Sequence, residues 1–312
     1  MKTLRFYIYI FMASALLISM MACSKATPVS YGDPGPVETA TKTLIPLQPG
    51  DSQRTLTVNG LERTYLLHVP YGLATGKFIP LVFVFHGLSE NASLIQQASG
   101  FNDIADKNGF IVVYPNGSGP SGSLSWNAGK CCGSAQVNAV DEAAFIRQII
   151  VDLNTTTKID RIRTYATGFS NGALLAYRLA CEMSDTFAAV APVAGALITD
   201  PCQPAQPVSV IHFQGLSDIV VPYGGGGTIP GTNQAFPPTE QSIATWVRLD
   251  ECTVSPKVEQ TVILTHTVHA SCKNGTAVEL YAVKGIGHSW PSQYVVPASQ
   301  IIWDFFAAHP KL

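Results

Sequence analysis

The chain has 312 residues, of which 46% are hydrophobic and 13% are charged, and its formal net charge is −2. A chain of this length forms one large domain or two smaller ones, and its hydrophobic content excludes a disordered protein. With 19 Lys and Arg against 21 Asp and Glu, no basic surface is expected, so nucleic-acid binding is not predicted.

The N-terminus has the pattern of an export signal. Lys2 and Arg5 precede an uncharged apolar run that is shorter than a typical membrane span. Ala22 and Cys23 follow, and a small residue directly before a cysteine is typical of bacterial lipoprotein signals, in which the cysteine is lipidated. We expect residues 1–22 to be such a signal, and the exported protein to be held to a membrane or cell surface by lipid on Cys23. The alternative is an ordinary signal peptide cut near Ala22.

Residues 23–53 are rich in Pro, Gly, Ser and Thr and lack hydrophobic periodicity. We therefore expect a flexible tether there, followed by one folded domain over residues 54–312, since no second boundary is visible. The domain opens with two strand-like segments joined by Asn59 and Gly60. This dipeptide suits a two-residue turn and predicts a β-hairpin.

Strand-like and helix-like segments then alternate along the chain. Apolar runs typical of strands buried on both faces lie at 81–85, 110–114, 162–166, 187–193, 208–213 and 279–283. Helical patterns lie at 92–107, 139–153, 171–180, 239–248 and 298–307. This alternation predicts an α/β fold with a mainly parallel sheet that helices cover on both faces.

The chain has seven cysteines, an even number if Cys23 carries lipid. In an exported protein this predicts disulfides, and pairs close in sequence are expected to join. The expected bonds are Cys181–Cys202 and Cys252–Cys272. Cys131 and Cys132 remain, as a disulfide between neighbours or as free thiols. The spacing of Cys and His does not fit a zinc site.

The sequence from Gly168 to Gly172 has the pattern G-x-S-x-G between a predicted strand and a predicted helix. A serine on such a turn projects its hydroxyl above the sheet, because the small flanking residues permit a tight bend. The N-terminus of the following helix supplies backbone N–H groups where an oxyanion would form. The pattern indicates Ser170 as a nucleophile.

A serine nucleophile needs a base and an orienting acid, which we look for in the order Ser, Asp, His. His288 lies in a glycine-rich loop after the strand at 279–283, whereas His212 falls inside an apolar strand and is expected in the core. Asp218 follows the strand at 208–213. Other carboxylates are expected to be solvated or capping residues: Asp185, Asp200 and Asp250.

A second oxyanion donor is expected after an early strand. His86 and Gly87 end the strand at 81–85, and the glycine lets the backbone turn so that the N–H of Leu88 points into the site. The alternative is a glycine that merely ends a strand.

Together these segments resemble the α/β-hydrolase esterases grouped with polyhydroxybutyrate depolymerases and with feruloyl and acetyl-xylan esterases of carbohydrate esterase family 1. The resemblance covers about residues 54–308. It is carried by residues 80–87, 113–117, 126–133, 168–172, 191–195, 218–223 and 287–291. Two positions depart from the family pattern, since Gln214 stands where His is frequent and Leu88 where a smaller residue is usual.

The resemblance implies an α/β-hydrolase fold and a catalytic triad of Ser170, Asp218 and His288. It also implies that the N–H groups of Leu88 and Asn171 form the oxyanion hole. Two tryptophans, Trp126 and Trp290, are expected near the substrate cleft, with core packing as their alternative. No metal or organic cofactor is implied.

We therefore predict an extracytoplasmic serine esterase that hydrolyses carboxylic esters through an acyl-enzyme. The expected substrates are feruloyl- or acetyl-type plant cell-wall esters, in soluble or oligomeric form. One alternative is a depolymerase of polyhydroxybutyrate or another polyester. Another is a catalytically inactive lipoprotein that binds a ligand with the same fold.

Overall fold

The computed structural model describes residues 47–73 and 76–312, which belong to one compact unit, Leu44–Leu312. The predicted signal peptide, Cys23 and most of the predicted tether lie outside these residues. Residues 50–53 were predicted in the tether, but they belong to the first strand because they pair with its neighbour. Within the described residues, no helix has the length and apolarity needed to cross a membrane.

Ten strands of the described residues form a single sheet in the order β1-β2-β4-β3-β5-β6-β7-β10-β9-β8. Neighbours from β4 to β10 run parallel, and the pairs at both ends of the sheet are antiparallel. The strands are β1 (Gly50–Val58), β2 (Leu61–Val69), β3 (Phe78–Phe85), β4 (Ile111–Pro115), β5 (Lys158–Phe169), β6 (Ala189–Val193), β7 (Ser209–Gly215), β8 (Lys257–Gln260), β9 (Leu264–His269) and β10 (Val278–Val283).

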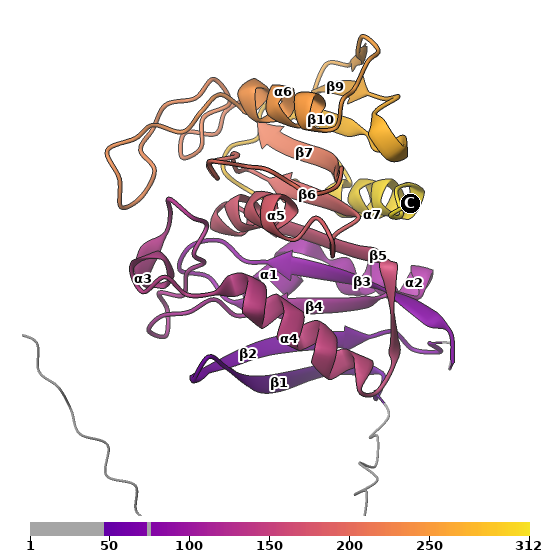
Figure 1. Ribbon diagram of the computed structural model, residues 1–312. Helices are drawn as coiled ribbons and strands as arrows, with labels where there is room; N and C mark the ends of the chain where they lie inside the picture. The colour runs from indigo at the N-terminus through magenta and orange to yellow at the C-terminus, as the bar shows by residue number, and fades with distance from the viewer. Residues whose placement is uncertain (1–46, 74–75) are drawn as a thin grey trace, which may run out of the picture. The chain divides into compact units, whose positions relative to one another are not determined.

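Helices cover both faces of this sheet, as the alternating pattern predicts (Figure 1). The covering helices are α1 (Ala92–Ser99), α2 (Phe101–Asn108), α4 (Glu142–Asn154), α5 (Asn171–Glu182), α6 (Thr239–Leu249) and α7 (Ala298–Ala308). The short helix α3 (Gly133–Val137) lies at the edge of the sheet. The single helix predicted at 92–107 is wrong: Gly100 adopts a left-handed conformation, with φ 63°, and divides it into α1 and α2.

Side chains of β3 show how the two layers of the core arise. Leu81, Phe83 and Phe85 pack on the face covered by α4, α5 and α6, and Val82 and Val84 pack on the face of α1, α2 and α7. Successive residues of a strand point to opposite faces, so an unbroken apolar run suits a strand that is buried on both sides.

Long connections follow the parallel strands at one edge of the sheet. In Figure 1 the loop with α3 and the loop between β7 and α6 both lie on the left of the sheet. The carboxyl ends of parallel strands meet at one such edge, where α/β proteins place their sites.

Candidate active site

Ser170 lies on the turn between β5 and α5. It has φ 54° and ψ −117°, a conformation that residues with a side chain rarely adopt. Its N–H donates to the carbonyl of Val193 at the end of β6, at 3.0 Å, which holds the turn in place. Its hydroxyl makes no capping bond to α5 and is directed elsewhere.

Two glycines make this turn possible. A Cβ on Gly172 would overlap the carbonyl oxygen of Phe85, and a Cβ on Gly168 would lie 2.6 Å from the carbonyl of Gly172. Helix α5 can therefore begin directly against the ends of β3 and β5 because these positions lack side chains. This close approach explains the small residues on either side of Ser170.

The three residues predicted as a triad form one hydrogen-bonded line. The Oγ of Ser170 lies 2.9 Å from Nε2 of His288, and Nδ1 of His288 lies 2.8 Å from Oδ2 of Asp218. His288 packs its ring against Phe169, and the side chain of Asp218 is fully buried. The structure thus brings together residues from three loops that are far apart in sequence.

Backbone contacts fix the loop of Asp218 against the loop of His288. The N–H of Ser217 donates to the carbonyl of Ile286 at 3.0 Å, and the N–H of Leu216 donates to the carbonyl of Val283 at 2.8 Å. A Cβ on Gly215 would overlap the carbonyl of Ile286. The glycine that ends β7 therefore lets the two loops touch.

The surroundings of Asp218 favour a carboxylate. Burial alone would raise its pKa, but hydrogen bonds from His288 and from the N–H groups of Val221 and Val220 outweigh burial and lower the pKa. A buried carboxylate beside Nδ1 keeps the imidazole in the tautomer whose Nε2 can accept the serine proton.

Two backbone N–H groups lie at the predicted oxyanion positions. Leu88 follows β3, and Asn171 is the first residue of α5, next to Ser170. Within the described part of the chain, neither N–H donates a hydrogen bond to another residue. Both are therefore free to donate to a substrate oxygen.

His86 orients the peptide that carries the N–H of Leu88. Its Nδ1 donates to the carbonyl of Gly87 at 2.7 Å, and its Nε2 accepts from the N–H of Gly117 at 2.9 Å. The carbonyl of Gly87 and the N–H of Leu88 belong to one planar peptide and point in opposite directions. Burial lowers the pKa of His86 to about 4, so this ring stays neutral.

Trp126 does not form a wall of the cleft, because the structure shows the alternative of core packing. The residue has no exposed surface, and its indole Nε1 donates to the carbonyl of His86 at 2.9 Å. Its backbone pairs with the side chain of Asn171, which accepts from the N–H of Trp126 at 2.8 Å and donates to its carbonyl. Trp126 is a buried link between the segments that carry the two N–H groups.

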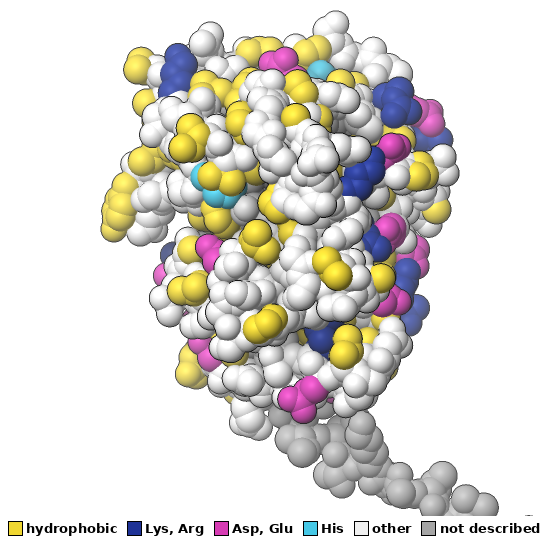
Figure 2. Space-filling view, turned by 90° about the vertical axis from the view of Figure 1, so that its left-hand side faces the viewer, with side chains coloured by type: hydrophobic (Ala, Val, Ile, Leu, Met, Phe, Trp, Pro, Cys, Tyr) yellow, Lys and Arg dark blue, Asp and Glu magenta, His cyan; other side chains and the backbone are white. Residues whose placement is uncertain are grey.

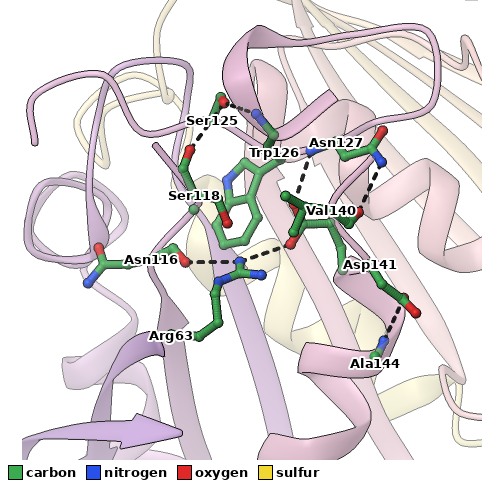
Figure 3. A network of polar contacts seen from close by, with 12 residues as sticks. Arg63, Asn116, Ser118, Ser125, Trp126, Asn127, Val140, Asp141 and Ala144 are labelled. Carbon is green, nitrogen blue, oxygen red and sulfur yellow. Dashed lines mark hydrogen bonds and ion pairs between the residues drawn. The ribbon is translucent and has the colours of Figure 1, made fainter. Parts of the chain in front are cut away.

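A buried ion pair holds the segment of Trp126 from beneath (Figure 3). Arg63 of β2 donates to Glu142 of α4 at 2.9 Å, and both side chains are buried. The other oxygen of Glu142 accepts from the N–H of Asn127 at 3.1 Å, and the amide of Asn127 donates to the carbonyl of Val140. Burial raises the pKa of Glu142, and the charge of Arg63 and the N–H of Asn127 oppose this shift.

Trp290 lies in the loop after His288 and is half-buried. Its Nε1 donates to the hydroxyl of Ser299 on α7 at 3.1 Å, and its ring meets Phe101 of α2 edge to face. These contacts account for its orientation, and its place at the cleft stays a prediction.

Three disulfides occur in the described residues: Cys181–Cys202, Cys252–Cys272 and the neighbouring pair Cys131–Cys132. The first joins α5 to the loop after β6, and the second joins the end of α6 to the segment after β9. No cluster of His, Cys, Asp or Glu in the described ranges is arranged to hold a metal ion.

The role of Gln214 was not predicted from the sequence, where this residue stands out only as a departure from the family pattern. The Nε2 of Gln214 donates to Oδ2 of Asp218 at 3.0 Å. A signal was present, because His212 and Gln214 are polar residues at alternate positions of an otherwise apolar strand.

Solved structures share this fold. An acetyl xylan esterase from Aspergillus awamori matches with a TM-score of 0.57 and 17% identity, covering 82% of this chain and 99% of that one. At this identity the likeness concerns the fold alone, and it confirms the predicted α/β-hydrolase fold.

Sequence relatives extend the likeness. Feruloyl esterase B of Piromyces equi is 31% identical over 235 residues, which cover 73% of this chain and 42% of that protein. NocK of Nocardia uniformis subsp. tsuyamanensis is 30% identical over 311 residues, which cover 90% of this chain and 88% of that protein. The chain thus spans less than half of the feruloyl esterase and most of NocK.

A family model described as Esterase PHB depolymerase matches residues 63–222, which include Ser170, Asp218 and both oxyanion positions. This match confirms the resemblance seen in the sequence and, at the level of the family, the prediction of a carboxylic ester hydrolase. The chain belongs to the Esterase PHB depolymerase family.

Proposed function

We propose that this protein is a serine esterase in which Ser170 attacks the carbonyl carbon of an ester. The observation that carries the proposal is the unbroken line of hydrogen bonds from Asp218 through His288 to the Oγ of Ser170. His288 takes the serine proton as the new bond forms, and Asp218 stabilises the imidazolium. The N–H groups of Leu88 and Asn171 then donate to the negative oxygen of the tetrahedral intermediate.

The same groups complete the first half of the reaction and carry out the second. His288 gives its proton to the leaving alcohol, and the acyl group remains on Ser170 as an ester. A water molecule then loses a proton to His288 and attacks this acyl-enzyme. The carboxylic acid leaves and Ser170 regains its proton, so the cycle needs no further reactant.

For the substrate we propose hydroxycinnamoyl or acetyl esters of plant cell-wall saccharides. The support comes from the relatives, since a feruloyl esterase is 31% identical in the matched region and an acetyl xylan esterase has a similar fold. The burial of Trp126 removes one argument for a flat apolar wall, so this proposal rests on similarity more than on the shape of the site.

A polyester is the second candidate, and the surface near the triad favours it. Large hydrophobic residues are exposed on the segments that follow β3, β7 and β10: Leu88, Leu216, Ile219, Val220, Tyr294 and Val295. Figure 2 looks onto this side of the molecule, where uncharged side chains fill the middle and most Lys and Arg lie towards the right-hand border. Exposed apolar side chains on the loops that follow these strands suit adsorption to an apolar polymer.

For location we propose export, with Cys23 as the lipid anchor. The disulfides are consistent with an oxidising compartment outside the cytoplasm. Cys23→Ser should release the protein from membranes or leave it unprocessed. A mature protein that begins elsewhere, or at Cys23 without acyl chains, would disprove the anchor while leaving the esterase untouched.

The reaction and the substrate are tested in one assay. Wild type, Ser170→Ala and the control His269→Ala are compared on methyl hydroxycinnamates, acetylated xylo-oligosaccharides and polyhydroxybutyrate granules. We expect release of hydroxycinnamate or acetate by wild type and control, and a loss of at least about 10³-fold in Ser170→Ala. Rapid clearing of granules with negligible release of either acid would favour the polyester. Full activity of Ser170→Ala would refute the proposed reaction.

A further inference from the structure

Two polar side chains lie on the buried face of β7 that points towards α5. His212 and Gln214 are 0% and 1% exposed, and they share this face with Val208 and Val210. Burying polar groups in an apolar layer is costly unless each finds a partner. Their partners therefore show what these residues do.

The partners form a chain that ends at the triad. The hydroxyl of Tyr177 on α5 lies 2.8 Å from Nδ1 of His212, and Nε2 of His212 lies 3.2 Å from Oε1 of Gln214. The Nε2 of Gln214 lies 3.0 Å from Oδ2 of Asp218 and 2.7 Å from the carbonyl of Val221.

The acceptors at one end of this chain fix every proton along it. Asp218 and Val221 both offer oxygens, so the amide of Gln214 must present its NH₂ group to them. Its Oε1 then accepts from Nε2–H of His212, which leaves Nδ1 to accept from the hydroxyl of Tyr177. Burial lowers the pKa of His212 to about 4, so the ring is neutral and has one N–H to donate.

These bonds determine which way the carboxylate faces. Oδ1 of Asp218 accepts from the N–H groups of Val220 and Val221, at 2.8 and 2.9 Å. Oδ2 accepts from Gln214 and from His288. Without Gln214, the only donor left on Oδ2 among the described residues is His288. The loop 218–221 also loses the bond to the carbonyl of Val221, and keeps the bond from the N–H of Asp218 to the carbonyl of Gly215 in β7, at 3.3 Å.

We propose that Gln214, oriented by His212 and Tyr177, is a positioning residue that aims Oδ2 of Asp218 at Nδ1 of His288. The proposal rests on the triad assigned above. Gln214 touches neither substrate nor Ser170 and acts through Asp218. Its effect therefore belongs to turnover, since a misaimed carboxylate weakens the base without changing how the ester binds.

A purely structural role predicts something different. If the hydrogen bonds from Tyr177 through His212 to Gln214 only satisfied buried polar groups, removing them would lower stability. Turnover per folded molecule would be unchanged. Because Gln214 and His212 are direct hydrogen-bond partners, their effects on stability are coupled under either role, so the coupling that decides is the one in kcat. If His212 instead acts on the triad as a relay, by orienting Gln214, then His212 affects kcat only when Gln214 is present. A double-mutant cycle measures this dependence directly.

The test compares kcat and KM for Gln214→Met, Gln214→Glu, His212→Phe and the double variant Gln214→Met/His212→Phe. The control is Val210→Ala, a truncation on the same buried face of β7. Gln214→Glu keeps the size of the side chain but places a carboxyl oxygen against Asp218 and Val221, so it provides a result if Gln214→Met does not fold. Folded fractions come from circular dichroism and thermal melts.

We expect kcat to fall about tenfold or more in both Gln214 variants, with KM within about twofold of wild type. His212→Phe should lower kcat by a smaller factor, and the double variant should match Gln214→Met. Val210→Ala should melt earlier and keep its kcat. Unchanged kcat in a folded Gln214 variant, or losses that multiply in the double variant, would overturn the relay. Because wild type and Ser170→Ala are assayed beside them, an inactive wild type would count against the proposed function instead.

Discussion

Ser170 shows how local geometry creates reactivity at the scale of one residue. Its positive φ turns the side chain out of β5, and the bond from its N–H to Val193 keeps that conformation in place. Its hydroxyl then meets His288 instead of capping α5. The close packing at Gly168 and Gly172 holds this strained conformation in place.

Residues of the triad could be predicted because each follows a strand in a loop with a clear pattern. Trp126 could not be placed, since its segment has no periodicity and its burial depends on Glu142 and Arg63, which are distant in sequence. Gln214 was missed for a similar reason. A polar residue in an apolar strand indicates a partner, but the identity of that partner is set by the tertiary structure.

The oxyanion hole gives a prediction at this scale. Leu88→Pro removes the N–H of residue 88, and we expect kcat to fall by about 10² to 10³, because one preorganised donor to the oxyanion is lost. Leu88→Ala keeps the N–H and should stay within about fivefold of wild type. Steady-state kinetics on a short-chain aryl ester make the comparison, and equal activity of the two variants would remove Leu88 from the oxyanion hole.

At the scale of elements, the positions of the strands were predicted better than the residues at which they begin and end. Buried strands extend beyond their predicted ends, as β5 does from 162–166 to Lys158–Phe169, because polar residues at both ends still pair with β3. The strand β8 was not predicted, since all its residues are exposed and charged Lys257 and Glu259 face solvent. Such a charged edge strand discourages pairing with other molecules.

Helix α6 ends at a residue whose burial was not expected. Asp250 was predicted to be a solvated or capping residue, and it is the C-cap residue of α6, but it has no exposed surface. Its Oδ1 accepts from the N–H of Val208 at 3.2 Å, and its Oδ2 has no partner among the described residues. Burial raises the pKa of Asp250 to about 7.

This shift predicts how stability depends on pH. An aspartate of the unfolded chain titrates near 4, so between about pH 4 and 7 the folded protein holds a proton that the unfolded chain has lost. The contribution of Asp250 to the free energy of unfolding is complete below about pH 4 and is lost as the pH rises through this window, by about 4 kcal/mol.

Asp250→Asn should remove this dependence. The amide keeps the acceptor for Val208 and cannot ionise, so we expect a higher free energy of unfolding than wild type at pH 8 and little difference at pH 4. Urea titrations at both pH values measure it, with Asp304→Asn on α7 as an exposed control. The burial argument would be contradicted if the free energy of unfolding changed with pH in wild type just as it does in Asp250→Asn.

At the scale of the whole folded unit, the alternation of strands and helices was enough to predict a parallel sheet covered on both faces. At its ends, the hairpin of β1 and β2 was predicted from Asn59 and Gly60 and is confirmed. The pairing of β2 with β4 and of β9 with β8 and β10 was not predictable, because pairing between distant segments depends on loop packing. The unit Leu44–Leu312 also holds the disulfides Cys181–Cys202 and Cys252–Cys272, which close loops of 21 and 20 residues.

These disulfides give a prediction for the stability of the unit. Replacing both Cys252 and Cys272 with Ala should lower the free energy of unfolding by about 3 kcal/mol, because the unfolded chain regains loop freedom. Kinetics should be unaffected, since the bond lies away from the triad loops. Non-reducing peptide mapping checks the pairing first, and a peptide joining Cys181 to Cys252 would refute it.

Covalent labelling of Ser170 by a reagent for activated serines is the most direct test of the whole account. An aryl fluorophosphonate should add one phosphonyl group per folded molecule, and peptide mass spectrometry should place it on Ser170. Labelling should be absent in Ser170→Ala, strongly slowed in His288→Ala and unchanged in His269→Ala. Stoichiometric labelling of another residue, or no labelling of a protein that hydrolyses esters, would contradict the assignment of Ser170 as the nucleophile.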